Sequence, residues 1–491
     1  MSTPEPYKFL HNVPARSDNF YLDSRLVPEV RAMLAAMSSR MPLGGVQARY
    51  QQLIDAVEVG GHQTLAEDRL CEYPLHPKVQ KFFDDFVGSY GHSSIMELTG
   101  EPCVFSQNLS WVSAWLLFDS PLCSGQEFST RAIQHKGWPM AQECYKQSGI
   151  LSCCPGQHHH GKFCLDKPDP DLKAIHDGWL EIYEAEVAWW TEHLSVPENR
   201  AALGIADKEP FRPALDRARW ALPGTISTGC AHTGNLRERS RVLSVGQAMA
   251  TGSGKACEAV WSNLTETYKS ALPGMAQYGL REAVYGDTRS LPYHLTDEQF
   301  LAPMMDWAKK HPVEVGVAYQ RTPSMHLPIR ECKNTYADPI YNQMAQVSVR
   351  IDCSIAVARD WHRHRTMYPW TMYLLVDMAH VTEDCTQIQI DSHYTPMSDL
   401  GKRMLPVMLR RSSVVFHELS DAGKHMLAAL ALPLGTAVRI QGAGGLRDVL
   451  YTLELRAEAH GGCFEYKEQA NAALGQLREK LTYEMRDALK I

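Results

Sequence analysis

Arg363, His364 and Arg365 form a short basic run whose side chains could hold an anion. Guanidinium groups match phosphate oxygens in a paired, planar geometry, and an imidazole adds a further hydrogen-bond donor. Such groups repel one another unless an anion lies among them. A solvated basic helix end is the commoner reason for such a run. The run therefore predicts either a phosphate-binding site or an exposed basic surface.

The residues before this run predict the elements that hold it. Residues 346–352 alternate apolar with polar side chains, as in a half-buried strand. From Ser354 onward the composition is helical, and neither Gly nor Pro occurs until Pro369. We therefore expect a strand that leads into a helix ending in Arg-His-Arg.

The nine residues 357–365, VARDWHRHR, resemble the signature region of the flavin-dependent thymidylate synthases. In that family Arg-His-Arg is followed by a Ser and then by Ser-x-Arg-Tyr. The residues after Arg365 lack both serines and the later arginine, and Asp360 replaces the family's Gln. This half of the chain alone therefore predicts an incomplete site.

The missing part of the signature lies in the first half. His92, Ser94 and Glu97 match the family's His-x-(Ser/Thr)-x-x-Glu element. Residues 124–131, SGQEFSTR, keep its Ser-x-Asn-Glu-x-Ser-x-Arg pattern except that Gln replaces Asn, whereas residues 119–121 have no Arg-His-Arg. A Ser-x-Arg taken alone is common on protein surfaces. The two halves thus keep opposite parts of one signature.

Four later positions extend the resemblance. Arg219 stands three residues before Leu222-Pro223, where the family has a nucleotide-contacting arginine, and Asn235 matches the Asn of its flavin-contacting Asn-x-Arg turn. In the second half Arg456 and His460 are four residues apart, hence on one helix face. They resemble the family's helix with a nucleotide-contacting arginine and a flavin-contacting histidine.

Two constant offsets indicate an internal repeat. Leu222-Pro223 and the following Gly, Leu and Arg recur 210 residues later, from Leu432-Pro433 onward, while Asp119 stands 244 residues before Arg363. The first half is therefore 34 residues longer between these points, which predicts an insertion at about 150–170. Its Cys and His residues fit no standard zinc spacing, so we predict a polar surface segment and no metal site.

We therefore predict an α+β protein made of two tandem copies of a synthase-like fold, each a small antiparallel sheet with helices. The first copy spans residues 1–285 and the second 286–491, and together they form an intramolecular pseudo-dimer. One composite site should lie between the halves. Its sister site should be inactive, because it would contain Asp119, Leu375 and Ala429 in place of the arginines.

The resemblance implies C5 methylation of a uridine-type nucleoside monophosphate, with FAD, NADPH and methylenetetrahydrofolate as cofactors and without a cysteine nucleophile. Arg456 and Arg131 are the expected catalytic residues. The expected substrate-binding residues are Glu127, Ser129, Arg131, Arg219, Arg363 and Arg456. The expected cofactor-binding residues are His92, Ser94, Asn235, Arg363, His364, Arg365 and His460.

Three other functions stay open. The departures from the family pattern are compatible with a flavin-dependent nucleotide hydroxymethylase or with a UMP methylase of a specialised pathway. A non-catalytic sensor of flavin or nucleotide belongs to another class, and it would not consume NADPH faster when nucleotide is present.

Composition restricts the partners. A net charge of -7 disfavours bulk binding of nucleic acid, although a local basic pocket is compatible with it. No apolar run reaches the roughly 18 residues of a membrane span, and we find no signal peptide. Thirteen irregularly spaced cysteines indicate reduced thiols. We therefore expect a cytoplasmic protein without a membrane segment that forms a homodimer, a pseudo-tetramer of halves.

Overall fold

The computed structural model describes residues 7–12, 19–41, 45–57, 63–89, 93–146, 167–205, 209–273, 312–320, 327–331, 337–367, 370–374, 390–458 and 463–491. Within these ranges the chain is a mixed α+β protein with two antiparallel sheets of four and five strands and one short two-stranded ribbon. None of the described helices combines the length and the apolar composition that crossing a bilayer requires. The described cysteines are free thiols.

The first sheet has the order β1-β2-β3-β7-β4, and all its neighbouring strands are antiparallel. Its strands are β1 (Leu10–Asn12), β2 (Phe20–Leu22), β3 (Cys103–Leu109), β4 (Cys123–Glu127) and β7 (Thr228–Gly234). The ribbon consists of β5 (Tyr145–Lys146) and β6 (Lys167–Pro168).

The helices of the first half pack around this sheet and on one another. Before β3 they are α1 (Pro28–Ser38), α2 (Gly45–Ile54), α3 (Gln63–Arg69), α4 (Pro77–Phe83) and the short turns η1 (Asp84–Ser89) and η2 (Ser93–Thr99). After β3 they are α5 (Trp111–Leu117), η3 (Gln142–Cys144), α6 (Pro170–Ser195), α7 (Pro197–Ala202), α8 (Phe211–Ala218), η4 (Arg219–Ala221), α9 (Leu236–Ser253) and α10 (Lys255–Ala271).

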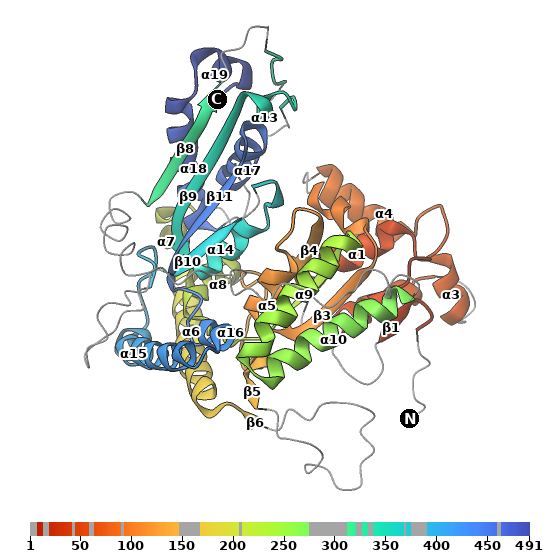
Figure 1. Cartoon of the computed structure of the whole chain (residues 1–491), viewed down its shortest axis with the longest axis horizontal. Helices are drawn as coiled ribbons and strands as arrows, with labels where there is room; N and C mark the ends of the chain where they lie inside the picture. Colours follow the sequence, from red (N-terminus) through yellow and green to blue (C-terminus); the bar gives the residue numbers. More distant parts are fainter. Residues whose placement is uncertain are drawn as a thin grey trace.

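The second sheet has the order β10-β11-β9-β8, again antiparallel throughout. Its strands are β8 (Val313–Gln320), β9 (Ala345–Ser354), β10 (Thr371–Leu374) and β11 (Ala437–Gly445). Its helices are α13 (Tyr341–Met344), α14 (Ile355–His362), η6 (Arg365–Met367), α15 (Asp399–Asp421), α16 (His425–Leu430), α17 (Leu446–Glu458), α18 (Phe464–Lys480) and α19 (Tyr483–Leu489). In Figure 1 the two sheets lie in separate parts of the molecule, and α14 extends from the second sheet towards β4 of the first.

The two sheets share one topology. Strands β2-β3-β7-β4 of the first sheet correspond in order and direction to β8-β9-β11-β10 of the second. In each half a helix, α5 or α14, follows the strand at the second position, and another, α9 or α17, follows the strand at the third. These helices start at Trp111 and Ile355 and at Leu236 and Leu446, which are the offsets of 244 and 210 residues found in the sequence.

The equivalent helices α5 and α14 also begin in the same way. Ser110 and Ser354 are their N-caps, and each hydroxyl oxygen accepts a hydrogen bond from the backbone N–H three residues on. A buried glutamate, Glu143 or Glu465, accepts hydrogen bonds from both the N–H and the hydroxyl of that serine. Each half therefore satisfies its buried helix start with the same pair of side chains.

The halves are joined by backbone as well as by side chains. The N–H of Leu434 donates to the carbonyl of Leu222 at 2.8 Å, and the N–H of Gly435 donates to the carbonyl of Trp220 at the same distance. A Cβ at Gly435 would lie 2.7 Å from that carbonyl oxygen, so only glycine allows this approach. The contact segments belong to the repeated Leu-Pro elements, which thus meet at the seam.

The long helices α6 and α15 pack across the seam in antiparallel fashion. Gly178 lies against Met408, while Glu186, eight residues later on α6, lies against the start of α15. The Glu186 carboxylate accepts hydrogen bonds from the N–H groups of Met397 and Ser398 and from the Ser398 hydroxyl. Glu186 is fully buried, and it is the sole described acceptor for these donors.

Most of the elements expected from sequence occur with shifted ends. The expected strand 346–352 is β9, and the helix from Ser354 ends at His362 rather than within Arg-His-Arg. The helix ends early because Arg363 is the C-cap and His364 begins a tighter turn. The segment about 150–170 and the 285/286 boundary fall largely or wholly outside the described residues.

Replacing Glu186 with Ala should lower the free energy of unfolding by about 2 to 4 kcal/mol, because it leaves buried N–H donors at the start of α15 unpaired. Urea denaturation followed by circular dichroism measures this loss. The control is Glu181→Ala on the exposed side of α6, which should change the value by about 0.5 kcal/mol at most. Equal losses in the two variants would contradict the proposed role of Glu186.

Candidate functional site

A buried carboxylate from the second half, Asp360, lies at the centre of a cluster of arginines at the seam. Its Oδ2 is 2.9 Å from Nη1 of Arg219 and 3.9 Å from Nε of Arg131, both from the first half. Its Oδ1 is 4.0 Å from Nη1 of Arg363. The sequence-predicted Arg131, Arg219 and Arg363 therefore share one carboxylate although they come from both halves.

Glu127 forms the second acidic contact of the cluster. It ends strand β4 of the first half and forms an ion pair with Arg359 of α14. Its other oxygen, Oε2, is 3.8 Å from Nη2 of Arg363, and the Thr228 hydroxyl donates to Oε1 at 3.1 Å. Because Glu127 and Arg359 are both at least 93 % buried, this ion pair is shielded from solvent.

The ring of Tyr466 links the two arginines expected to be catalytic. The guanidinium carbons of Arg131 and Arg456 lie 5.6 and 4.8 Å from its centroid, within the range of cation–π contacts. Nη2 of Arg456 also donates to the backbone carbonyl of Asp360 at 2.7 Å. Arg131 of the first half and Arg456 of the second therefore meet at one aromatic ring.

The cluster carries more positive than negative charge. Its described ion pairs and ring contacts unite five guanidinium groups, those of Arg131, Arg219, Arg359, Arg363 and Arg456, with three carboxylates. The third carboxylate is that of Asp216, 3.6 Å from Arg219. Among these described contacts the guanidinium groups outnumber the carboxylates by two, and such an imbalance in a partly buried cluster favours the binding of an anion.

The directions in which the pKa values of Asp360 and Arg363 are shifted agree with this arrangement of buried charges. Burial alone would raise the pKa of Asp360, but the guanidinium groups of Arg131 and Arg219 outweigh burial and hold it far below the usual 3.8. Burial lowers the pKa of Arg363, and Asp360 and Glu127 only partly oppose this. Arg363 thus has two carboxylates within 4.0 Å, and its side chain keeps 29 % exposure towards solvent.

Ser129 belongs to the turn that presents Arg131. Its Oγ accepts a hydrogen bond from the Arg131 N–H at 3.4 Å, and its own N–H donates to the carbonyl of Ser39. The turn that carries Ser129 and Arg131 is thus anchored on the end of α1.

A second contact across the seam lies beside the cluster. Arg365 forms an ion pair with Glu97, whose carboxylate also accepts a hydrogen bond from the Ser124 hydroxyl at 3.4 Å. Burial lowers the pKa of Arg365 to about 10. The buried Nε2 of the neighbouring His364 has no hydrogen-bond partner among the described residues. Burial, with Arg456 and Arg363 nearby, holds the pKa of His364 well below 6.5, so its ring is neutral at pH 7.

Of the remaining predicted cofactor residues, the structure describes Asn235 and the backbone of Ser94. Asn235 is the N-cap of α9, where its side-chain oxygen accepts from the Arg237 N–H, and its N–H donates to the carbonyl of Leu122 just before β4. Ser94 lies in η2, and its side chain is not described. His92 and His460 lie outside the described residues.

Asp216, Asp360 and Tyr466 belong to the cluster but were not among the predicted site residues, and Arg359 was expected in the composite site without an assigned role. Asp360 appeared in the sequence only as a departure from the family's Gln, although its spacing of three residues from Arg363 in a helix was a usable signal. Arg359 preceded it on the same helix. Tyr466 gave no local signal, because its role depends on how α18 packs against the seam.

The position expected for the sister site differs in its chemistry. Ala429 is fully buried and apolar, and Asp119 lies 3.8 Å from Nε2 of His362, whose ring stacks on Trp115 at 3.8 Å. Leu375 lies outside the described residues. This region therefore differs from the other side in its contacts: Arg241 donates to the backbone carbonyl of Asp119, and Ala429 takes the place of an arginine.

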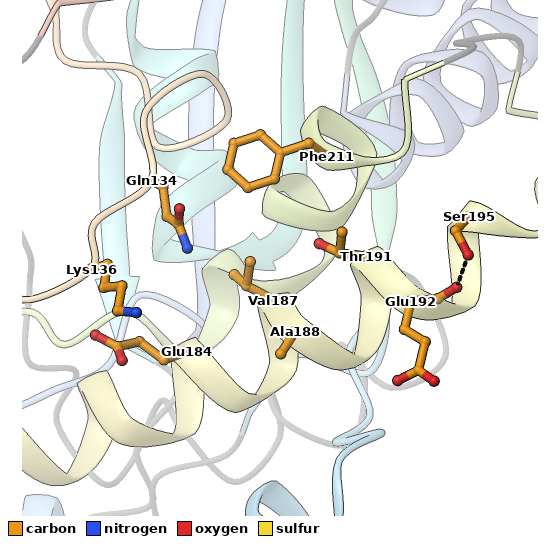
Figure 2. Close-up of a pocket in the computed structure, with 9 residues that line it drawn as sticks. All are labelled: Gln134, Lys136, Glu184, Val187, Ala188, Thr191, Glu192, Ser195 and Phe211. Atoms are coloured by element: carbon orange, nitrogen blue, oxygen red, sulfur yellow. Dashed lines mark hydrogen bonds between the residues drawn. The ribbon is translucent and has the colours of Figure 1, made fainter.

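A separate depression of about 530 Å³ runs along the exposed side of α6 (Figure 2). Its lining combines apolar side chains with Lys136 and two glutamates: Gln134, Lys136, Glu184, Val187, Ala188, Thr191, Glu192, Ser195 and Phe211. None of the predicted site residues lines it.

No model of a protein family matches the chain, and the search of curated sequences finds no match either.

Replacing Asp360 with Asn should change how stability depends on pH. Because the pKa of this carboxyl is lower in the folded state than in the unfolded state, the Asp360 carboxylate contributes fully to stability above pH 3.8. This contribution to stability is lost as the pH falls below that value. Wild type should therefore lose stability between pH 5 and pH 3 more steeply than the variant, which should already be weaker at pH 7 by about 3 to 5 kcal/mol.

Urea denaturation at several pH values provides the test, with the exposed Asp399→Asn as the matched control. Parallel pH profiles for wild type and Asp360→Asn would rule out the central role of this carboxylate.

Proposed function

We propose that the protein is a flavin-dependent methylase that methylates C5 of a uridine-type nucleoside monophosphate at the seam between its two halves. The proposal combines the resemblance to the flavin-dependent thymidylate synthases with the geometry of the arginine cluster. It includes a finer statement of fold, namely that each half is a diverged copy of the synthase fold. The shared strand order of the two sheets supports that statement.

The observation that carries the proposal is the meeting of Arg131 with Arg363 and Arg456. The first half lacks Arg-His-Arg and the second lacks Ser-x-Arg, so neither half alone would hold the full set. Arg131 and Arg363 share Asp360, and Arg131 and Arg456 share the ring of Tyr466. Unrelated losses in two copies would have no reason to leave complementary groups around one point.

The substrate's phosphate would bind at the arginines that remain partly open. A phosphate monoester carries up to two negative charges, which matches the excess of two positive charges in the cluster. Arg363 and Arg131 keep 29 % and 22 % side-chain exposure, whereas Arg219 is buried. Arg363 and Arg131, with the Ser129 hydroxyl, would therefore contact the phosphate, while Arg219 would orient Asp360 and through it the two open guanidinium groups.

Arg456 would act on the base rather than on the phosphate. Its Nη2 is held by the Asp360 carbonyl, and its plane is steadied by Tyr466, so the guanidinium has a fixed direction before substrate arrives. A preorganised cation next to a pyrimidine carbonyl stabilises negative charge that develops on the ring as C5 is alkylated. Loss of Arg456 should therefore affect turnover more than binding.

The groups present fit a bound FAD in part. His364 offers a neutral ring with an unpartnered buried Nε2, and Arg365 and Glu97 form the adjacent wall, with Asn235 at the nearby end of β7. FAD would supply the reducing equivalents taken from NADPH, and methylenetetrahydrofolate would supply the one-carbon unit. The chain's own task is then to position and to neutralise charge. We expect the active protein to be a homodimer.

Analysis of the nucleotide product distinguishes the proposed methylase from two related enzymes, a hydroxymethylase and a UMP methylase. A hydroxymethylase or a UMP methylase would use the same cluster, since both need the phosphate and the base in the same places. A flavin or nucleotide sensor, from a different class, would bind the nucleotide without releasing the C5 hydrogen. Asp360, which replaces the family's Gln, is the change nearest the substrate arginines. It is the main reason to keep the hydroxymethylase and the UMP methylase as alternatives.

Arg131→Ala and Arg456→Ala should each reduce turnover by about 2 to 4 kcal/mol in activation free energy, roughly 30- to 900-fold. The assay is tritium release from C5-labelled dUMP, UMP and dCMP with folate cofactor, FAD and NADPH. Arg403→Ala, an exposed arginine on α15, is the matched control and should retain wild-type activity. Wild-type rates in Arg131→Ala or Arg456→Ala would refute the composite site.

Asp119→Asn should leave kcat/KM within about twofold of wild type, because Asp119 belongs to the position of the lost sister site and contacts His362 only at 3.8 Å. The same tritium assay measures it. Strong inactivation, with an unchanged melting temperature, would show that both positions take part in catalysis.

A further inference from the structure

Three side chains outside the arginine cluster bring metal-ligating atoms together. Asp391 and His393 lie in the turn that leads to α15, and Glu465 lies in the first turn of α18. One ligand atom of each lies within 4.8 Å of the others. Asp391 and Glu465 are buried, whereas the His393 side chain is 20 % exposed, so an ion could enter from that side.

The donor set suits a borderline divalent cation. One imidazole nitrogen and two carboxylate oxygens are ligands that Zn²⁺ and Mn²⁺ accept, whereas Mg²⁺ prefers oxygen ligands alone. Bonds of about 2.0 to 2.2 Å to one ion place its donors about 3 to 3.5 Å apart. The donors that now lie up to 4.8 Å apart would therefore move closer, whereas Asp391 Oδ1 and His393 Nδ1, now 2.6 Å apart, would separate. Glu465 Oε2 accepts a single described hydrogen bond, from Ser354, and therefore retains a lone pair for an ion.

Carboxylates outnumber the cations around His393, even though Arg219 acts electrostatically on Glu465. The nearby Asp352 is engaged by Arg439 through two hydrogen bonds, of 2.6 and 2.8 Å. Three carboxylates remain around one imidazole, since Glu468 Oε2 lies 3.7 Å from His393 Nε2 and Asp391 Oδ1 lies 2.6 Å from Nδ1. A protonated imidazole offsets one of these charges, whereas a divalent cation offsets two.

A buried hydroxyl beside the cluster gives an independent indication of a missing ligand. Tyr394 follows His393 and packs edge-on against Phe464, the residue before Glu465, with 5.7 Å between ring centroids. Its side chain is only 7 % exposed, and its hydroxyl has no hydrogen-bond partner among the described residues. Buried hydroxyls normally have a partner, and a water bound to an ion would provide one here.

We propose that Asp391, His393 and Glu465 bind a divalent transition-metal ion, with Zn²⁺ or Mn²⁺ as the fitting class. The ion would tie the turn before α15 to the start of α18. Glu465 caps α14 and precedes Tyr466, so the tie would hold in place both the helix with Asp360 and the ring that Arg131 and Arg456 contact. The site stands on its own geometry and does not depend on the methylase proposal.

The test uses the full-length protein, stripped of metal by a chelator and then titrated with Zn²⁺ or Mn²⁺. Bound metal is counted by elemental analysis after gel filtration, and affinity is measured by competition with a chelator of known strength. The variant is His393→Gln, and the matched control is His11→Gln, since His11 also pairs with an aspartate, Asp23 at 3.2 Å, but belongs to no cluster of three metal-ligating side chains among the described residues.

We expect His393→Gln to bind one Zn²⁺ per chain fewer than wild type and His11→Gln, with affinity at this site weakened by about 100-fold or more. The difference in metal content between the variants does not include any metal that binds elsewhere in the chain. Asp391→Asn, which keeps the turn's hydrogen-bond acceptor, should give the same loss if His393→Gln fails to fold. Equal Zn²⁺ and Mn²⁺ content in all four proteins would overturn the proposal and leave an imidazolium–carboxylate pair.

Discussion

The ion pair between Arg219 and Asp360 is the constraint on which the seam depends. Both side chains are almost fully buried, and each comes from a different half. Without its partner, Arg219 would keep only the more distant Asp216, and Asp360 only the more distant Arg131 and Arg363. The pair therefore requires the halves to stay in register. The same carboxylate draws Arg131 and Arg363 towards one point, and its backbone carbonyl fixes Arg456. Thus one carboxylate both joins the halves and shapes the cationic surface between them.

Around this asymmetric centre the framework is close to symmetric. Both halves contain the same order of four strands, and both cap the helix after the second strand with a serine bound by a buried glutamate, Glu143 or Glu465. Charged groups do not follow this symmetry. For example, the position equivalent to Arg219 holds the buried Ala429. Buried packing is needed in both halves to keep the fold, whereas a cluster at the seam needs only one set of charged groups, and this difference accounts for a symmetric framework around an asymmetric centre.

The sequence predicted local elements and paired positions well, and it predicted tertiary contacts only where a resemblance supplied them. Alternation located β9, and the offsets of 210 and 244 residues located equivalent helix starts. That Arg131 would meet Arg363 was an inference from complementary motifs. Neither pattern nor motif indicated Tyr466, because a ring contributes to a site only through the packing of its helix. The end of α14 was also misplaced, since a C-cap is decided by the turn that follows and not by composition. His92 and His460 stay predictions.

The most direct test of the account is the number and position of phosphate groups bound by the protein. Calorimetric titration with dUMP and UMP, followed by a crystal structure of the complex, measures both. The account predicts one nucleotide per chain, with its phosphate in contact with Arg131 from the first half and Arg363 from the second. Two nucleotides per chain, or a phosphate held by residues of one half alone, would contradict a single composite site.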